Sequence, residues 1–145
     1  MEQRMNMQQV LPEVYGKMME LEMVVKATRI DPTILELVKI RASQMNGCAF
    51  CLNMHTRDAR KLGESEQRMY LLSAWREAPL YSEEERAALA LTEAVTRLDG
   101  HGVADDVYDE AVRLFGQEGT AKVIMAIVAI NSWNRIAVST RLMPV

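Results

Sequence analysis

Cysteine, proline and glycine are all scarce in this sequence, and a secretion signal is missing. The 145 residues include only two cysteines, four prolines and seven glycines. A chain of this length buries roughly 70% of the surface of its unfolded state, so it needs no disulfide framework in order to fold. The opening residues MEQRMNMQQV contain no apolar core of the kind found in signal peptides. We therefore expect a cytoplasmic protein, in which two cysteines are more typical of catalysis or metal binding than of a permanent bridge.

The sequence also lacks an excess of positive charge and a long hydrophobic run. Its net charge of −3 excludes the basic surface that is typical of nucleic-acid binding. The longest apolar run, VIMAIVAI at residues 123–130, is eight residues long. A membrane-spanning helix requires about 20 apolar residues. We expect a protein that binds neither nucleic acid nor membranes.

Helix-forming residues, by contrast, are abundant, and no segment carries a clear strand pattern. Asp31-Pro32 predicts the start of a helix that ends near Asn46-Gly47, and Ser82 with Glu85 predicts a capping box for a helix over 83–98. The remaining predicted helices cover residues 9–28, 48–63, 66–78, 104–115 and 118–140. With no repeat or linker in between, we predict a single all-α domain over residues 1–145, a bundle of about six to seven helices.

Both cysteines and one of the two histidines lie together in the stretch MNGCAFCLNMHTRDARKL, residues 45–62. At about 100° per residue, Cys48, Cys51 and His55 fall within an arc of about 60° on one helical face. The charged side chains of the stretch lie on the other side of the helix: Arg57, Arg60 and Lys61. The pattern therefore predicts that the two thiols and the imidazole face the apolar interior.

The spacing of these three residues has chemical content. A C-x-x-C pair places two sulfurs one turn apart, where they can close a disulfide, and the first turn of a helix favours a thiolate over a thiol. His55 lies one turn beyond Cys51, so its imidazole can accept the thiol proton directly or through a water. Three interpretations stay open at this point: two inert buried cysteines, a zinc site that recruits Glu36 or His101 as a further ligand, and redox chemistry. The spacing favours redox chemistry.

The wider stretch ELVKIRASQMNGCAFCLNMHTRDARKLG, residues 36–63, resembles the core of the AhpD-like alkylhydroperoxidases of the carboxymuconolactone decarboxylase superfamily. The motif of that family is a glutamate, eleven residues, and then C-x-x-C-x-x-x-H. Here the matching positions are Glu36, Cys48, Cys51 and His55. The stretch INSWNRIAVS, residues 130–139, is similar to the last-helix signature of the family, and the resemblance covers about residues 15–142.

The resemblance implies a cysteine-based alkyl hydroperoxide reductase with the C-x-x-C pair at the start of a core helix. Cys51 would be the peroxidatic thiol and Cys48 the resolving one, while Glu36 and His55 would form a proton relay. It implies a small organic hydroperoxide as substrate and no bound metal or cofactor. An external dithiol, such as protein-bound dihydrolipoamide, would reduce the disulfide. It also implies a homo-oligomer, a trimer or a hexamer.

Two positions favour other interpretations. Taken on its own helix, Glu36 lies opposite the apolar stripe, which predicts a solvated carboxylate paired with Lys39. Phe50 stands where some members of the family carry a histidine, which points to a weaker peroxidase or to the alternative of a thiol–disulfide switch or partner-binding module. The C-x-x-C pair argues against lactone decarboxylation, because the decarboxylase branch generally lacks it. In the last helix, we expect Arg135 to form a buried ion pair.

Overall fold

The computed structural model describes all residues 1–145 as seven α-helices and one short 3₁₀-helix, and it contains no β-strand. The elements are α1 (Met7–Val10), α2 (Pro12–Ala27), α3 (Pro32–Asn46), α4 (Ala49–Lys61), α5 (Glu66–Tyr70), the 3₁₀-helix η1 (Leu72–Ala74), α6 (Glu83–Arg97) and α7 (Asp105–Thr140). The all-α fold predicted from the composition is confirmed.

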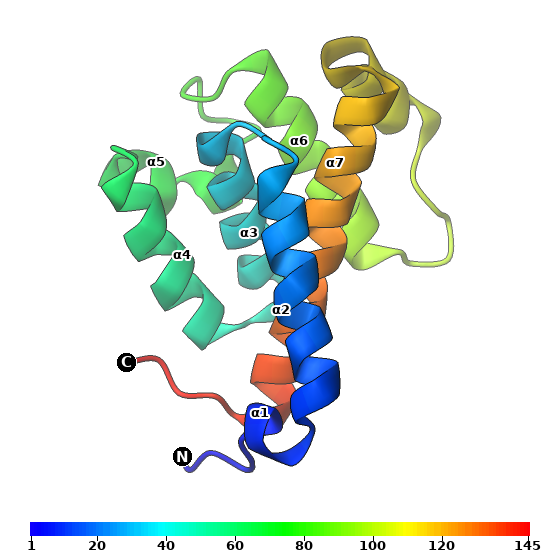
Figure 1. Cartoon of the computed structure of the whole chain (residues 1–145). Helices are drawn as coiled ribbons and strands as arrows, with labels where there is room; N and C mark the ends of the chain where they lie inside the picture. Colours follow the sequence, from blue (N-terminus) through cyan, green and yellow to red (C-terminus); the bar gives the residue numbers. More distant parts are fainter.

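Helix α3 is the centre of the bundle. It packs against α4, α6 and α7, and α2 lies along α7 on the outside (Figure 1). More than half of α3 is buried, including side chains on both sides of the helix such as Leu37, Lys39 and Ser43. A helix buried on nearly all sides can present polar groups to its neighbours only where those groups find partners.

The predicted ends of α3 and α6 are confirmed. The Asp31 side chain accepts hydrogen bonds from the main-chain N–H groups of Thr33 and Ile34, at 2.9 and 3.1 Å. Gly47 ends α3 in the left-handed region, at φ 65°, which costs little without a Cβ atom. Ser82 and Glu85 form the reciprocal capping box at the start of α6.

The segment predicted as one helix over 9–28 is two helices, α1 and α2. The break falls at Leu11, whose φ of −137° and ψ of 64° are not helical. Its cause is Pro12, because the ring of a proline disfavours helical geometry in the residue before it. Pro12 itself is the first residue of α2, where its missing N–H costs nothing.

The prediction of a continuous helix over 66–78 is wrong, because α5 already ends at Tyr70. Five side chains of this region are buried in one cluster, and they recur at every third residue: Met69, Leu72, Trp75, Ala78 and Tyr81. That spacing would spiral around an α-helix, whereas a tighter 3₁₀ turn keeps residues three apart on one side. Arg86 of α6 donates hydrogen bonds to the carbonyls of Trp75, Arg76 and Ala78, which holds this segment against α6.

The long element α7 contains the predicted interruption at Gly116, whose φ of 70° and ψ of 175° are not helical. By length and composition alone, α7 is apolar enough to cross a membrane. Its side chains Val123, Ile127 and Ile130 are nevertheless at most 2% exposed, because they form the core between α3 and α6. Packing within the bundle thus accounts for this face of the helix, whereas Met125, Val128 and Val138 are 39–47% exposed.

The carboxylate of Glu93 in α6 accepts hydrogen bonds from three side chains in two neighbouring segments. The donors are Arg41 Nε at 2.8 Å, Trp75 Nε1 at 2.9 Å and Arg76. Burial raises the pKa of this carboxyl, but the hydrogen bonds from Arg76, Trp75 and Arg41 outweigh it, and the pKa lies below its ordinary value of 4.5. The ionised form of Glu93 therefore ties α3 and the segment after η1 to α6.

Replacing Glu93 with glutamine should reduce the free energy of unfolding by about 1–3 kcal/mol at pH 7, because hydrogen bonds to charged groups contribute on that order. A carboxyl with a lowered pKa in the folded state stabilises the fold fully above its unfolded pKa and loses this contribution as the pH falls. In urea unfolding, the difference between wild type and Glu93→Gln should therefore narrow below pH 4.5.

Glu66→Gln is the matched control, because Glu66 pairs with Arg60 while both side chains are more than half exposed. Exposed ion pairs contribute little, so this variant should unfold like the wild type at every pH. Equal effects of the two substitutions would contradict a stabilising role for the Glu93 cluster.

Candidate functional site

The corner between α3 and α4 sets the position of the cysteine pair. The N–H of Cys48 donates to the carbonyl of Ser43 at 3.0 Å, which closes the turn around Gly47. Cys48 is not inside the helix, as the angular argument assumed, but is its N-cap, with φ −90° and ψ 95°. Its sulfur accepts the main-chain N–H of Cys51 at 3.3 Å. This sulfur thus satisfies one of the free N–H groups of the first turn.

Cys48 and Cys51 are joined in a disulfide, with their Cα atoms 5.4 Å apart. They are 1% and 2% exposed, and His55 is 6% exposed. The disulfide lies in a cluster with Ala42, Ile130 and Ala137, against which three larger side chains pack: Phe50, Trp133 and Leu142. The prediction that the two cysteines and His55 face the interior is confirmed.

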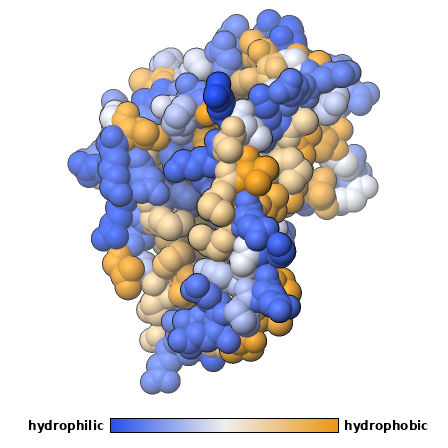
Figure 2. Space-filling model, in the orientation of Figure 1, coloured by the Kyte–Doolittle hydropathy of each residue, from blue (hydrophilic) through white to orange (hydrophobic).

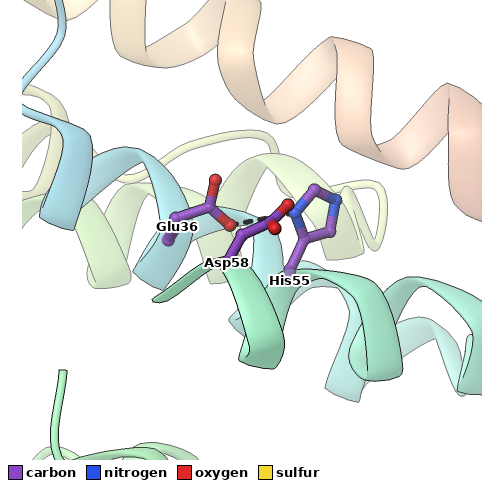
Figure 3. Close-up of side chains that lie close together, drawn as sticks. All are labelled: Glu36, His55 and Asp58. Atoms are coloured by element: carbon purple, nitrogen blue, oxygen red, sulfur yellow. Dashed lines mark hydrogen bonds and ion pairs between the residues drawn. The ribbon is translucent and has the colours of Figure 1, made fainter. Parts of the chain in front are cut away.

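Glu36 and His55 form a buried pair between α3 and α4. Glu36 Oε2 and His55 Nδ1 are 2.9 Å apart, and the side chains are 12% and 7% exposed. Figure 3 shows the carboxylate and the imidazole pointing toward each other across the two helices. When Glu36 is ionised, Nδ1–H is the donor, which leaves Nε2 of the same ring to accept a proton.

The alternative prediction for Glu36, a solvated carboxylate paired with Lys39, is wrong. Lys39 is 5% exposed and forms its ion pair with Glu22 of α2. Glu36 points the other way, toward α4, because α3 is covered on both sides and offers each charged group a partner on a different helix. The structure thus brings Glu36 and His55 together, as the resemblance implied.

Asp58, which was not predicted from the sequence, is a third polar residue at this place. Donor atoms of Glu36, His55 and Asp58 all lie within 4.8 Å of one another, and Figure 3 shows the three side chains converging. Asp58 is 43% exposed and also contacts Lys61 at 3.2 Å. Its spacing of three from His55 was the available signal, since residues three apart share a helix face.

The group formed by these three residues is not the cysteine-containing zinc site that the sequence left open. It consists of one imidazole and two carboxylates, while the cysteine sulfurs are bonded to each other. His101, the other ligand considered, is exposed in the loop between α6 and α7. Glu36 lies 2.9 Å from His55, and the two cysteine sulfurs are bonded to each other.

A buried network of amides ties α7 to the end of α3, next to the cysteine pair. Asn134 donates to Ser43 Oγ at 3.0 Å, and Asn46 donates to Asn134 and Asn131 at 2.9 and 3.0 Å. Arg135 is exposed and donates to the carbonyl and the side-chain oxygen of Asn131. The predicted buried ion pair of Arg135 is therefore wrong, and the polar signature of the last helix holds the corner before Cys48 through its asparagines.

Comparisons with known proteins agree with this arrangement. A model of the carboxymuconolactone decarboxylase family matches residues 12–94. The uncharacterized protein YdfG of Bacillus subtilis (strain 168) is 46% identical over 139 residues, which cover 96% of this chain and 95% of YdfG.

Solved structures share the fold. The protein of unknown function ATU0492 from Agrobacterium tumefaciens, assigned provisionally as the antioxidant defence protein AhpD, superimposes with a TM-score of 0.96 at 41% identity, over 99% of both chains. The debrominase Bmp8 superimposes with a TM-score of 0.81 at 18% identity, over 92% of this chain and 72% of that protein. The same fold thus occurs in proteins that are named for different activities. The fold alone therefore does not identify the reaction, and the residues of the site have to.

Proposed function

We propose that this chain, which belongs to the carboxymuconolactone decarboxylase family, is a cysteine-based alkyl hydroperoxide reductase. The observation that carries the proposal is the combination of a C-x-x-C pair at the start of a helix with a buried Glu36–His55 pair one turn further on. A helix N-terminus stabilises a thiolate, and an imidazole held by a carboxylate is a suitable proton acceptor.

In the reduced protein, Cys51 would be the nucleophile. His55 takes the thiol proton, directly or through a water, while Glu36 holds the opposite ring nitrogen and stabilises the imidazolium. The thiolate attacks the terminal oxygen of the hydroperoxide, so that an S–O bond forms and the O–O bond breaks. The alkoxide leaves with the proton from His55, which yields an alcohol and a sulfenic acid on Cys51.

Cys48 would then resolve the sulfenic acid. Its thiol sulfur attacks the sulfur of Cys51 and displaces the hydroxyl group as water, which gives the disulfide seen in the structure. An external dithiol, such as protein-bound dihydrolipoamide, exchanges with this disulfide and restores both thiols while it is itself oxidised. The balance is one hydroperoxide and one dithiol converted to one alcohol, one water and one oxidised dithiol, with no bound cofactor.

Thiol titration tests this chemistry directly. The fully reduced protein should present two thiols per chain, lose both after one equivalent of cumene hydroperoxide, and regain both after addition of dihydrolipoamide. Retention of two thiols after peroxide treatment would contradict the proposal. Stoichiometric zinc in the purified protein, measured by atomic absorption, would also contradict it, because zinc-bound thiolates would not form this redox pair.

The second candidate function is a thiol–disulfide switch or a partner-binding module, and Phe50 is the observation that favours it. Phe50 packs its apolar ring against the cysteine cluster, at the position where some members of the family carry a histidine. A switch would form the disulfide readily but turn over slowly. Steady-state peroxide consumption with dihydrolipoamide as reductant distinguishes the two functions, because rapid multiple turnover excludes a pure switch.

We also propose that the chain acts as a homo-oligomer, a trimer or a hexamer, in which α2 contributes to the contacts between copies. Among its side chains only Val25 is buried, although α2 is rich in apolar residues. Three of its large apolar side chains are 45–63% exposed: Met19, Met23 and Val24. Figure 2 shows apolar side chains reaching the surface over this helix. Exposed apolar faces of this kind mark contacts with other molecules.

The double substitution Met23→Glu and Val24→Glu should reduce the mass of the particle in solution to that of a smaller assembly, because charges are strongly disfavoured inside an interface core. Size-exclusion chromatography with light scattering measures the mass. Tyr70→Glu is the control, since Tyr70 is 72% exposed on α5, away from α2. A monomeric wild type, or equal masses for all three proteins, would contradict the proposal.

A further inference from the structure

The disulfide is closed off from solvent, although the proposed reaction requires a peroxide and a dithiol to reach its sulfurs. Cys48 and Cys51 are 1% and 2% exposed. Thiol–disulfide exchange needs direct contact between the attacking sulfur and the disulfide. Part of the covering structure must therefore move before either reactant can react, and the way each covering side chain is anchored indicates which part moves.

Most of the cover is anchored firmly. Ala42, Ile130 and Ala137 belong to the core helices α3 and α7 and are at most 5% exposed. The Trp133 indole donates to Glu22 at 3.3 Å and packs edge-on against Tyr15, with ring centroids 5.3 Å apart. Moving any of these side chains would disturb a helix–helix contact.

Phe50 belongs to α4, so Leu142 is the one covering side chain that lies outside the helices. Arg141 ends α7 in the left-handed region, at φ 54°, and the Leu142 N–H donates to the carbonyl of Ala137 at 2.9 Å. Its side chain is partly buried and packs against the cysteine cluster. The segment 141–145 thus begins at the end of α7 and places one apolar side chain on the cover of the disulfide.

Beyond Leu142, the segment crosses to the first half of α4 and is held there weakly. Figure 1 shows it leaving α7 and running past the start of α4. The Asn53 side chain donates to the main-chain oxygen of Val145 at 2.8 Å, and this hydrogen bond is exposed. Met143 is 39% exposed, and Pro144 has no N–H to donate. A short segment held by one exposed side-chain hydrogen bond opens more readily than packed helices.

We infer that the segment 141–145 is the movable cover of the disulfide, and that Leu142 is the residue that controls access to Cys48 and Cys51. Opening breaks the Asn53–Val145 hydrogen bond and the hydrogen bond from the Leu142 N–H to Ala137, and it lifts Leu142 from the cluster while α4 and α7 stay in place. The passage that opens is lined by Phe50 and Trp133, so it suits a hydroperoxide with an apolar body. This preference for an apolar substrate rests on the proposed function, whereas the cover itself does not.

The rate of disulfide reduction by dithiothreitol, followed without any peroxide, tests the cover. Leu142→Ala and Asn53→Ala should each be reduced roughly five- to tenfold faster than wild type, the change expected when one contact that holds the closed form is lost. At high dithiothreitol the rate should level off at the opening rate, and this plateau should rise in both variants. Asn53 is only partly buried and its variant is expected to fold, which circular dichroism verifies.

Met143→Ala is the matched control, because Met143 lies in the same segment, is 39% exposed and is not part of the cysteine cluster. It should be reduced at the wild-type rate. The inference is overturned if Leu142→Ala and Asn53→Ala react like the wild type, or if Met143→Ala accelerates as much as they do. Since no peroxide is present, failure of the peroxidase proposal leaves this readout unchanged, and failure of the cover leaves peroxide-driven thiol loss intact.

Discussion

Replacing Cys51 with serine should reduce hydroperoxide consumption by roughly three orders of magnitude or more, the effect typical of removing a nucleophile. A hydroxyl at this position is protonated at neutral pH and is a far weaker nucleophile toward an O–O bond than a thiolate. The fold should be preserved, because serine keeps the shape of the side chain and Cys48 still caps α4 through its sulfur. Peroxide loss in the presence of dihydrolipoamide is the measurement.

Cys48→Ser is the matched variant, and it should lose the recycling of the enzyme rather than its first reaction with peroxide. With Cys51 intact, the first turnover still occurs, so one equivalent of peroxide is consumed and Cys51 becomes a sulfenic acid that dimedone traps. No intramolecular disulfide can follow, and recycling should slow strongly. If the two variants exchanged these behaviours, Cys48 would be the peroxidatic residue. If both consumed peroxide like the wild type, neither cysteine would carry the reaction.

The features predicted best from the sequence are those decided by neighbouring residues. Asp31 and Gly47 bound α3 as expected, and the capping box of Ser82 and Glu85 starts α6, because caps depend on hydrogen bonds within a few residues. The region 66–78 was predicted wrongly for the opposite reason. Its buried side chains pack into one cluster with Leu37 and Ile40 of α3 and Leu89 of α6, a contact that no local propensity reveals.

In the candidate site, too, features decided by neighbouring residues were predicted from spacing and those decided by contacts between distant residues were not. The inward face of Cys51 and His55 follows from helical spacing alone, and the structure confirms it. The contact between Glu36 and His55 joins two helices, so spacing on either helix could not predict it, and only the family resemblance did. Leu142 and Asn53 stand far apart in the sequence, and their place beside the disulfide depends on where α7 ends. The catalytic roles of the four motif residues stay predictions until the variants are measured.

Removing the imidazole should have the second largest effect. His55→Ala is expected to slow the oxidation of the reduced protein by peroxide by roughly 10²–10⁴-fold at pH 7, the usual contribution of a positioned general base. The reason is geometric, since His55 lies one turn from Cys51 and is held at 2.9 Å by Glu36. Glu36→Gln should act in the same direction with a smaller effect, because the amide can still position the ring but carries no charge to stabilise the imidazolium. Stopped-flow measurement of thiol loss gives both rates.

The pH dependence separates a lost base from a damaged fold. An ordinary cysteine thiol ionises near pH 8.5, so solvent produces the thiolate without help as the pH rises. The deficit of His55→Ala should therefore shrink above that pH, whereas a disrupted site would stay slow throughout. His101→Ala removes the exposed histidine of the loop between α6 and α7 and should match the wild type at every pH. Equal oxidation rates for wild type and His55→Ala at pH 7 would show that proton transfer at Cys51 does not run through this imidazole.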